Sequence, residues 1–105
     1  MIDHKTLYEK LCTLGIPVAY DHFDSNKQVA IPFIVYRELQ GSTFRADDIT
    51  YHLFHNFEIE LITEKKDIVV EKQLEDLLTN NKIPYEKNDE VWDNDEKIYH
   101  NYYEI

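Results

Sequence analysis

Several residue types that common catalytic motifs require are scarce in this chain of 105 residues. Its only glycines, Gly15 and Gly41, cannot supply a Walker phosphate-binding loop or a glycine-rich dinucleotide fingerprint. No serine lies in a G-x-S-x-G nucleophile elbow. The single Cys12 has no partner for an intramolecular disulfide, and its place among helical leucines favours an inert thiol. These absences argue against nucleophilic catalysis and nucleotide binding.

Basic residues are scarce as well: 11 lysines and arginines stand against 21 aspartates and glutamates, which gives a formal net charge of -10. A surface of this charge repels a polyanion, so we expect no direct sequence-specific binding of nucleic acid. No apolar run reaches the roughly 18 residues of a membrane-spanning helix, and the N-terminus lacks the pattern of a signal peptide. We therefore expect a soluble protein of a reducing cytoplasm with no membrane partner.

The apolar residues are sufficient for one folded domain over residues 1–105, since 43% of the chain is hydrophobic and 13% aromatic. The longest alternation of apolar and polar residues is YHLFHNFEIELIT, residues 51–63. Alternation with period two predicts a long central strand of an antiparallel sheet. Its expected apolar face carries Tyr51, Leu53, Phe57, Ile59 and Leu61, and its polar face carries Asn56, Glu58 and Glu60.

Two amphipathic helices are predicted to cover the apolar face of that strand. The first has Asp3 as its N-cap and runs to about Leu14, where Gly15 ends it. The second follows Asp67 as its N-cap and runs from Ile68 to about Asn80. Leucines recur at helical spacing in both segments, which gives each helix one apolar stripe.

The remaining segments predict further strands. Residues 18–23 are short and alternate, and Pro32 opens a second strand over residues 33–39; we expect the two to pair as a hairpin. An extended segment begins at residue 83, residues 88–96 have the composition of an acidic turn, and residues 97–105 form the last strand. The predicted fold is α+β, with a mainly antiparallel sheet of four to five strands and two helices packed on one face, in the order α-β-β-β-α-β-β.

Two regions are candidates for contacts with a partner. The segment QGSTFRADDIT, residues 40–50, is long for a connection between strands, which is typical of a functional loop. Its apolar Phe44 and Ile49 either contact a partner or fold back onto their own sheet. The last strand has aromatic residues on both faces, which suggests that one face meets another subunit.

No metal site or other catalytic site is predicted. His52 and His55 are separated by three residues, so on a strand their rings point to opposite faces. The acidic pairs Asp47-Asp48 and Asp93 with Asp95 do not fit the ligand spacing of a helix-loop-helix calcium site. We expect a non-enzymatic protein without a cofactor.

Six segments in a fixed order resemble the tail-completion, or tail terminator, proteins of siphophages and prophages. They are LYEKLCTLGIPVAYDHF, PFIVY, YHLFHNFEIELIT, EKKDIVVEKQLEDLL, IPYEK and EKIYHNYYEI. The resemblance covers most of the chain and lies in the order of elements, because no single motif is diagnostic.

The resemblance implies a structural role in the virion. Such proteins form a ring, often hexameric, that caps the tail tube and docks to the head-tail connector, and DNA passes through the lumen. The protein would be found in the bacterial host cytoplasm during assembly and in the tail or neck of the virion. By analogy, the candidate contacts with other subunits and with the tail-tube protein are Phe44, Arg45, Asp47, Asp48, Ile49, Trp92, Tyr99 and Tyr103.

A second hypothesis belongs to a different class. An acidic phage-encoded protein can inhibit a host nucleic-acid enzyme by presenting carboxylates where DNA phosphates would bind. The dense acidic run is residues 86–96, and this hypothesis requires those carboxylates to form one stripe.

Overall fold

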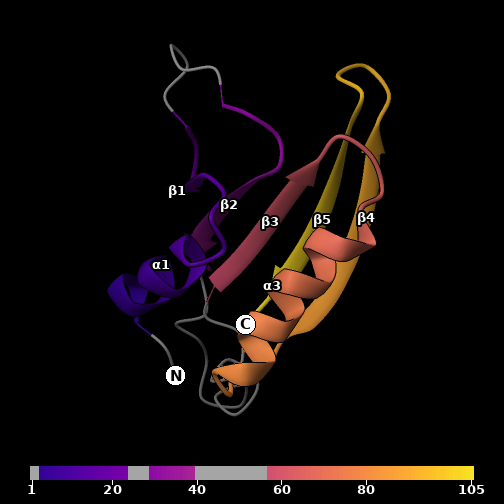
Figure 1. The fold of residues 1–105 in the computed structure, drawn as a ribbon. Helices are drawn as coiled ribbons and strands as arrows, with labels where there is room; N and C mark the ends of the chain where they lie inside the picture. The colour runs from indigo at the N-terminus through magenta and orange to yellow at the C-terminus, as the bar shows by residue number, and fades with distance from the viewer. Residues whose placement is uncertain (1–2, 24–28, 40–56) are drawn as a thin grey trace, which may run out of the picture.

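The computed structural model describes residues 3–23, 29–39 and 57–105. Five strands form one mixed sheet in the order β1-β2-β3-β5-β4, and all neighbours except β1 and β2 are antiparallel. This arrangement confirms the predicted α+β fold and the predicted order of elements (Figure 1). The elements are α1 (His4–Cys12), β1 (Val18–Tyr20), β2 (Phe33–Glu38), β3 (Phe57–Thr63), α3 (Ile68–Asn80), β4 (Glu86–Asp93) and β5 (Ile98–Glu104).

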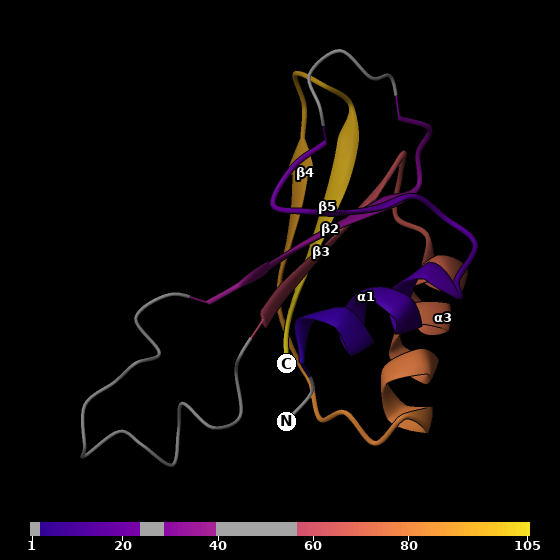
Figure 2. The same cartoon turned by 90° about the vertical axis from the view of Figure 1, so that its left-hand side faces the viewer.

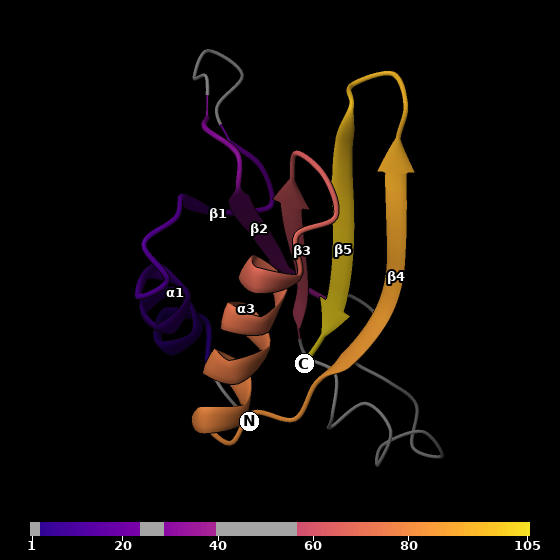
Figure 3. The same cartoon turned by 45° about the vertical axis from the view of Figure 1, so that its right-hand side comes forward.

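Both helices lie on the same face of the sheet, as the views in Figure 2 and Figure 3 agree. The core forms between this helix-covered face and the apolar stripes of the helices. Leu7 and Leu11 of α1 and Leu74 and Leu78 of α3 are fully buried against the sheet. The sheet contributes Ile34, Tyr36, Phe57, Ile59, Leu61 and Tyr103 to the same cluster.

The helix boundaries follow from local side-chain chemistry. The Asp3 carboxylate accepts a hydrogen bond from the backbone N–H of Thr6 at 2.8 Å, and Asp67 accepts from two N–H groups of the first turn of α3. Gly15 adopts φ +80 just beyond α1, a conformation that glycine tolerates without steric cost. Both predicted N-caps are confirmed, and α1 ends at Cys12, two residues before the predicted position.

Strand β3 shows the predicted alternation over residues 57–63. Phe57, Ile59 and Leu61 are buried under the helices, and Glu58 and Glu60 are half-buried on the opposite face. The prediction for residues 51–56 lies outside the described residues.

The prediction of a hairpin between the first two strands is wrong. Val18 pairs with Ile34 and Tyr20 with Tyr36 in parallel register. The connection over residues 21–32 is long enough to return the chain to the end of the sheet where β1 begins, and a parallel neighbour requires such a connection.

The prediction of an acidic turn over residues 88–96 is wrong for most of its length. Residues up to Asp93 belong to β4, which pairs with β5 along the edge of the sheet. An edge strand exposed to solvent tolerates charged side chains, so acidic composition does not exclude a strand there. The register shifts between Lys87 and Asp89, which marks a β-bulge.

Candidate functional site

The two outer strands of the sheet, β1 and β4, carry exposed aromatic residues at opposite edges of the molecule. Tyr20 of β1 is 42% exposed, and the neighbouring Tyr8 of α1 is 44% exposed. Trp92 of β4, the only tryptophan in the chain, is 46% exposed. Exposed rings of this size are enriched in protein interfaces, so these two edges are the candidate functional site.

The β1 edge contains a groove of about 460 Å³ lined by His4, Lys5, Tyr8, Tyr20 and Tyr36, which we call the aromatic groove. The His4 and Tyr20 rings are stacked with centroids 4.8 Å apart. The Tyr36 ring meets both of them edge-on, at 5.3 Å from each. Edge-to-face contacts of this kind hold rings in fixed positions, so the groove is preformed.

Helix geometry explains how α1 contributes to the aromatic groove. His4 and Tyr8 are four residues apart and therefore lie on one side of the helix. Leu7 and Leu11 fix that helix on the sheet, which brings the two rings over β1 and β2. The Tyr20 hydroxyl accepts a hydrogen bond from the backbone N–H of Glu38 at 3.2 Å, which ties the β1 edge to β2.

Tyr36 forms the buried floor of the aromatic groove. Its side chain is 1% exposed, and this burial, with smaller contributions from Tyr8 and Cys12, raises the pKa of Tyr36 to about 12. The phenol therefore stays neutral at physiological pH. The floor of the groove presents an uncharged ring to any occupant.

At the opposite edge, Trp92 lies on the helix-covered face of the sheet. It pairs with Tyr99 of β5, and the two ring centroids are 6.4 Å apart. Tyr99 pairs in turn with Thr63. Side chains two residues apart lie on the same face of a strand, so Thr63 is on the helix-covered face with the buried residues of β3. The indole therefore projects from the same face that carries the aromatic groove on the other edge.

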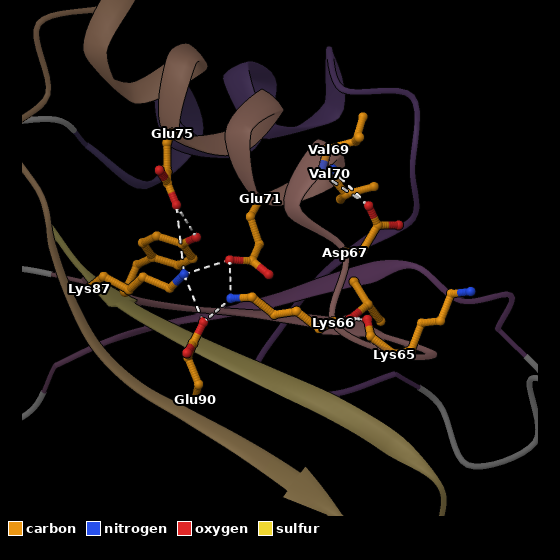
Figure 4. A network of polar contacts seen from close by, with 11 residues as sticks. Lys65, Lys66, Asp67, Val69, Val70, Glu71, Glu75, Lys87 and Glu90 are labelled. Atoms are coloured by element: carbon orange, nitrogen blue, oxygen red, sulfur yellow. Dashed lines mark hydrogen bonds and ion pairs between the residues drawn. The ribbon is translucent and has the colours of Figure 1, made fainter.

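A cluster of charged side chains connects β4 to α3 (Figure 4). We call Lys66, Glu71, Lys87 and Glu90 the polar cluster. Glu71 Oε1 accepts hydrogen bonds from Lys66 Nζ at 2.9 Å and from Lys87 Nζ at 2.5 Å. Glu90 forms ion pairs with both lysines, at 3.0 Å to Lys87. Two elements distant in the sequence are thereby joined through one buried carboxylate.

The ion pairs of the polar cluster shift the pKa of its exposed members. The pKa of Lys66 is raised, mainly by its bond to Glu90 and then by its bond to Glu71. The pKa of Glu90 is lowered by Lys66 and then by Lys87. Burial alone would lower the pKa of Lys87, but its bonds to Glu71 and Glu90 outweigh burial and raise it. All three groups are held in their charged forms at neutral pH.

Tyr103 lies beside the polar cluster and belongs to the core. Its hydroxyl donates a hydrogen bond to Glu75 Oε2 at 2.7 Å, and the Lys87 ammonium lies 5.6 Å from the centre of its ring. Burial, and then the bond to Glu75, raises the pKa of Tyr103. Tyr103 thus anchors β5 to α3.

Some buried polar atoms on this side of the sheet have no hydrogen-bond partner among the described residues: Glu71 Oε2 and both side-chain polar atoms of Asn101. Asn101 lies between Tyr99 and Tyr103 on the same face of β5, and it is fully buried. Lys66 lies over the Tyr99 ring and Lys87 over the Tyr103 ring, so Asn101 lies beneath the polar cluster. Burying such atoms without a partner costs stability.

On the opposite face of the sheet, which neither helix covers, charged side chains alternate with apolar ones. Arg37 pairs with Glu58 at 2.9 Å, and His100 pairs with Glu60. Burial, and then the charge of Glu60, raises the pKa of Tyr102. This face is therefore a second, more polar surface.

The predicted contact residues have different positions in the structure. Trp92 is exposed, Tyr99 is half-buried beneath Lys66, and Tyr103 is 0% exposed within its own core. Tyr103 is buried within the subunit because β5 is paired on both sides and α3 covers that face, and its role as a contact residue stays a prediction. The other five predicted contacts, Phe44, Arg45, Asp47, Asp48 and Ile49, lie outside the described residues.

Sequence reasoning missed the aromatic groove and the polar cluster. A signal for the groove was present in the spacing of His4 and Tyr8, two rings one helical turn apart on an otherwise leucine-based helix. No comparable signal exists for the polar cluster, because Glu71 and Lys87 meet only through the pairing of β4 with β5.

Within residues 3–23, 29–39 and 57–105, no three histidine, cysteine, aspartate or glutamate side chains are grouped so as to hold a metal ion. His52 and His55 lie outside these ranges, so the prediction about them stays a prediction. In the same described ranges, neither helix has the length and apolar composition needed to cross a membrane.

Comparisons with known proteins identify no relative. No protein-family model matches the chain, and neither a curated protein nor a solved structure matches it.

Proposed function

We propose that the protein is a non-enzymatic structural subunit of a phage or prophage tail, which assembles into a ring that caps the tail tube and docks to the head-tail connector. The resemblance to tail terminator proteins motivates this role. The protein would work by self-association and docking in the virion neck, and would need no cofactor.

The observation that carries the proposal is the placement of the exposed aromatic residues at opposite edges of one sheet. Tyr8 and Tyr20 lie at the β1 edge and Trp92 lies at the β4 edge. A ring requires two different surfaces on each subunit, so that one surface of each copy meets the other surface of the next. Two unlike aromatic patches on opposite sides of the subunit fulfil that requirement.

Two measurements test the proposal. Native mass spectrometry and light scattering over a concentration series report the oligomeric state, and a pull-down with a phage tail-tube protein reports docking. We expect a discrete closed oligomer and retention on the tube protein. A chain that stays monomeric at every concentration and does not bind the tube protein would contradict the proposal.

One observation favours the second hypothesis, inhibition of a nucleic-acid enzyme by an acidic surface. On the sheet face without helices, Glu58 of β3 and Glu86 of β4 each lie directly opposite Glu104 of β5. Three carboxylates thus lie in a row across adjacent strands, and with Arg37 paired to Glu58 at one end the row still carries a net negative charge. This hypothesis predicts that the protein competes with duplex DNA for a DNA-binding enzyme and does not bind the tube protein.

A further inference from the structure

We infer that the subunits join by continuation of the sheet: β4 of one copy pairs antiparallel with β1 of the next, and Trp92 enters the aromatic groove of that neighbour. This inference rests on the proposed self-association and specifies its interface. The occupant of the groove is a second copy of this chain, and the contact is head-to-tail.

The direction of the strands supports this joint. β1 is parallel to β2, and β2 is antiparallel to β3. β3 is antiparallel to β5, and β5 is antiparallel to β4. It follows that β1 and β4 run in opposite directions within one subunit. When two copies lie edge to edge in the same orientation, β4 of the first and β1 of the second form an antiparallel pair, which is the more stable type.

Both outer strands present an edge for this pairing, since no described strand pairs with the outer side of β1 or β4. The Pro17 carbonyl accepts from Ile34 N–H, and Asp21 N–H donates to the Tyr36 carbonyl. Backbone groups alternate in direction along a strand, so those of Val18 and the N–H of Tyr20 point away from β2 and are placed to meet another strand. The Tyr20 carbonyl accepts a hydrogen bond from His22 N–H at 2.7 Å, which marks the end of the edge that can pair.

The length and irregularity of β4 indicate which part of it pairs. The β-bulge lies between Lys87 and Asp89, and bulges protect an edge against pairing. The segment from Val91 to Asp93 follows the bulge, pairs regularly with β5, and contains the exposed Trp92. It is as long as β1, which has three residues.

Side-chain direction brings Trp92 to the aromatic groove. Both Trp92 and Tyr20 project from the helix-covered face, and a continuous sheet keeps that face on one side across the joint. Within one subunit, the residues paired from strand to strand place Val18 of β1 level with Glu90 of β4. Aligning Trp92 with Tyr20 therefore needs a stagger of about four residues between copies, in keeping with the tilted strands of closed sheets.

The chemistry of the two surfaces is complementary. The five residues that line the aromatic groove include Lys5 and no carboxylate. Trp92 is followed by Asp93, so the β4 edge brings a negative charge toward Lys5. An indole among tyrosine rings buries a large apolar area and makes favourable ring contacts. Tryptophan and tyrosine are also the residue types that dominate interface energies.

A complementation experiment tests this pairing. The variant Trp92→Ala lacks the inserting side chain but keeps the groove, whereas Tyr8→Ala lacks part of the groove but keeps Trp92. We expect each variant alone to self-associate about 30-fold more weakly than the wild type, as for an interface residue of major importance. Mixed together, they retain one intact joint and should form a 1:1 dimer that does not grow further.

The control is Val69→Ala, which shortens an exposed apolar side chain in the first turn of α3, away from both edges. It should associate as the wild type does. Circular dichroism and thermal melting verify that all three variants are folded. If the mixture of Trp92→Ala and Tyr8→Ala stays monomeric while the wild type associates, the inferred joint is wrong and the proposed self-association still holds.

Because Trp92 is the only tryptophan, its fluorescence gives a second readout. We expect emission to shift to shorter wavelength, and quenching by acrylamide to fall, with the same concentration midpoint as association. Unchanged emission through the association transition would refute the inferred joint alone. A wild-type protein that never associates would refute the joint, and if it also failed to bind the tube protein it would refute the proposed ring as well.

Discussion

Lys87 Nζ of β4 lies 2.5 Å from Glu71 Oε1 of α3. β4 pairs with β5 on one side only, and this ion pair is a direct link from the edge strand to the helical layer. Glu71 is 4% exposed, so one carboxylate in the interior fixes the strand that carries Trp92. The position of the candidate interface thus depends on a charge contact some distance from it.

Replacing that carboxylate should destabilise the fold. Glu71→Gln keeps the shape of the side chain but leaves Lys66 and Lys87 without their shared acceptor charge. We expect the free energy of unfolding to fall by about 2 kcal/mol. This is less than the cost of breaking a fully buried ion pair, because both lysines still form ion pairs with Glu90. Urea denaturation measures the change. Glu64→Gln, at an exposed position, should stay within about 0.5 kcal/mol of the wild type.

The polar cluster should also weaken in acid. The pKa of Glu90 is lowered in the fold by Lys66 and then by Lys87 from its ordinary 4.5. A lowered pKa gives stability that is present above the ordinary value and is lost as the pH falls through the folded value. The stability difference between the wild type and Glu90→Gln should therefore be constant near neutral pH and shrink below about pH 4.5. A difference that stayed constant into strong acid would show that the carboxylate charge of Glu90 is not involved.

The parts of the fold that the sequence predicts correctly are those determined by neighbours along the chain. Asp3 and Asp67 cap their helices through bonds that span two or three residues, and the alternation in β3 is visible in the printed sequence. Periodicity alone fixes which face of such a strand is buried.

The errors concern pairings between distant segments. Whether β1 meets β2 in parallel or antiparallel register depends on the course of residues 21–32, which no local pattern encodes. The burial of Tyr103 is equally invisible in the sequence, because Glu75 and Lys87 reach it only after α3 and β4 have docked. The groove and the polar cluster could not be predicted for the same reason.

Alkaline pH should destabilise the floor of the aromatic groove. Burial raises the pKa of Tyr36 from 10.0 to about 12. A raised pKa in the fold gives stability that is fully present below the ordinary value and is lost as the pH rises through the folded one. The wild type should therefore lose more stability than Tyr36→Phe between pH 10 and 12. Thermal melts at stepped pH, with tyrosinate absorbance as a direct readout, measure this. Equal losses in the two proteins would show that Tyr36 does not contribute.

The last prediction concerns Asn101, which is fully buried in a strand paired on both sides. Its amide nitrogen and oxygen have no partner among the described residues, and each such atom costs about 1 to 3 kcal/mol. Asn101→Val removes both atoms and introduces a side chain suited to a central strand. We expect the free energy of unfolding to rise by about 1 kcal/mol.

Asn101→Ala separates the polar effect from packing, because it removes the same two atoms without filling the space they leave. It should be less stable than Asn101→Val, by the cost of a small cavity. If both variants are instead less stable than the wild type by similar amounts, the amide makes hydrogen bonds of its own, for which buried water beneath Glu71 is the natural partner. Such a result would make Asn101 part of the support that holds the β4 edge in place.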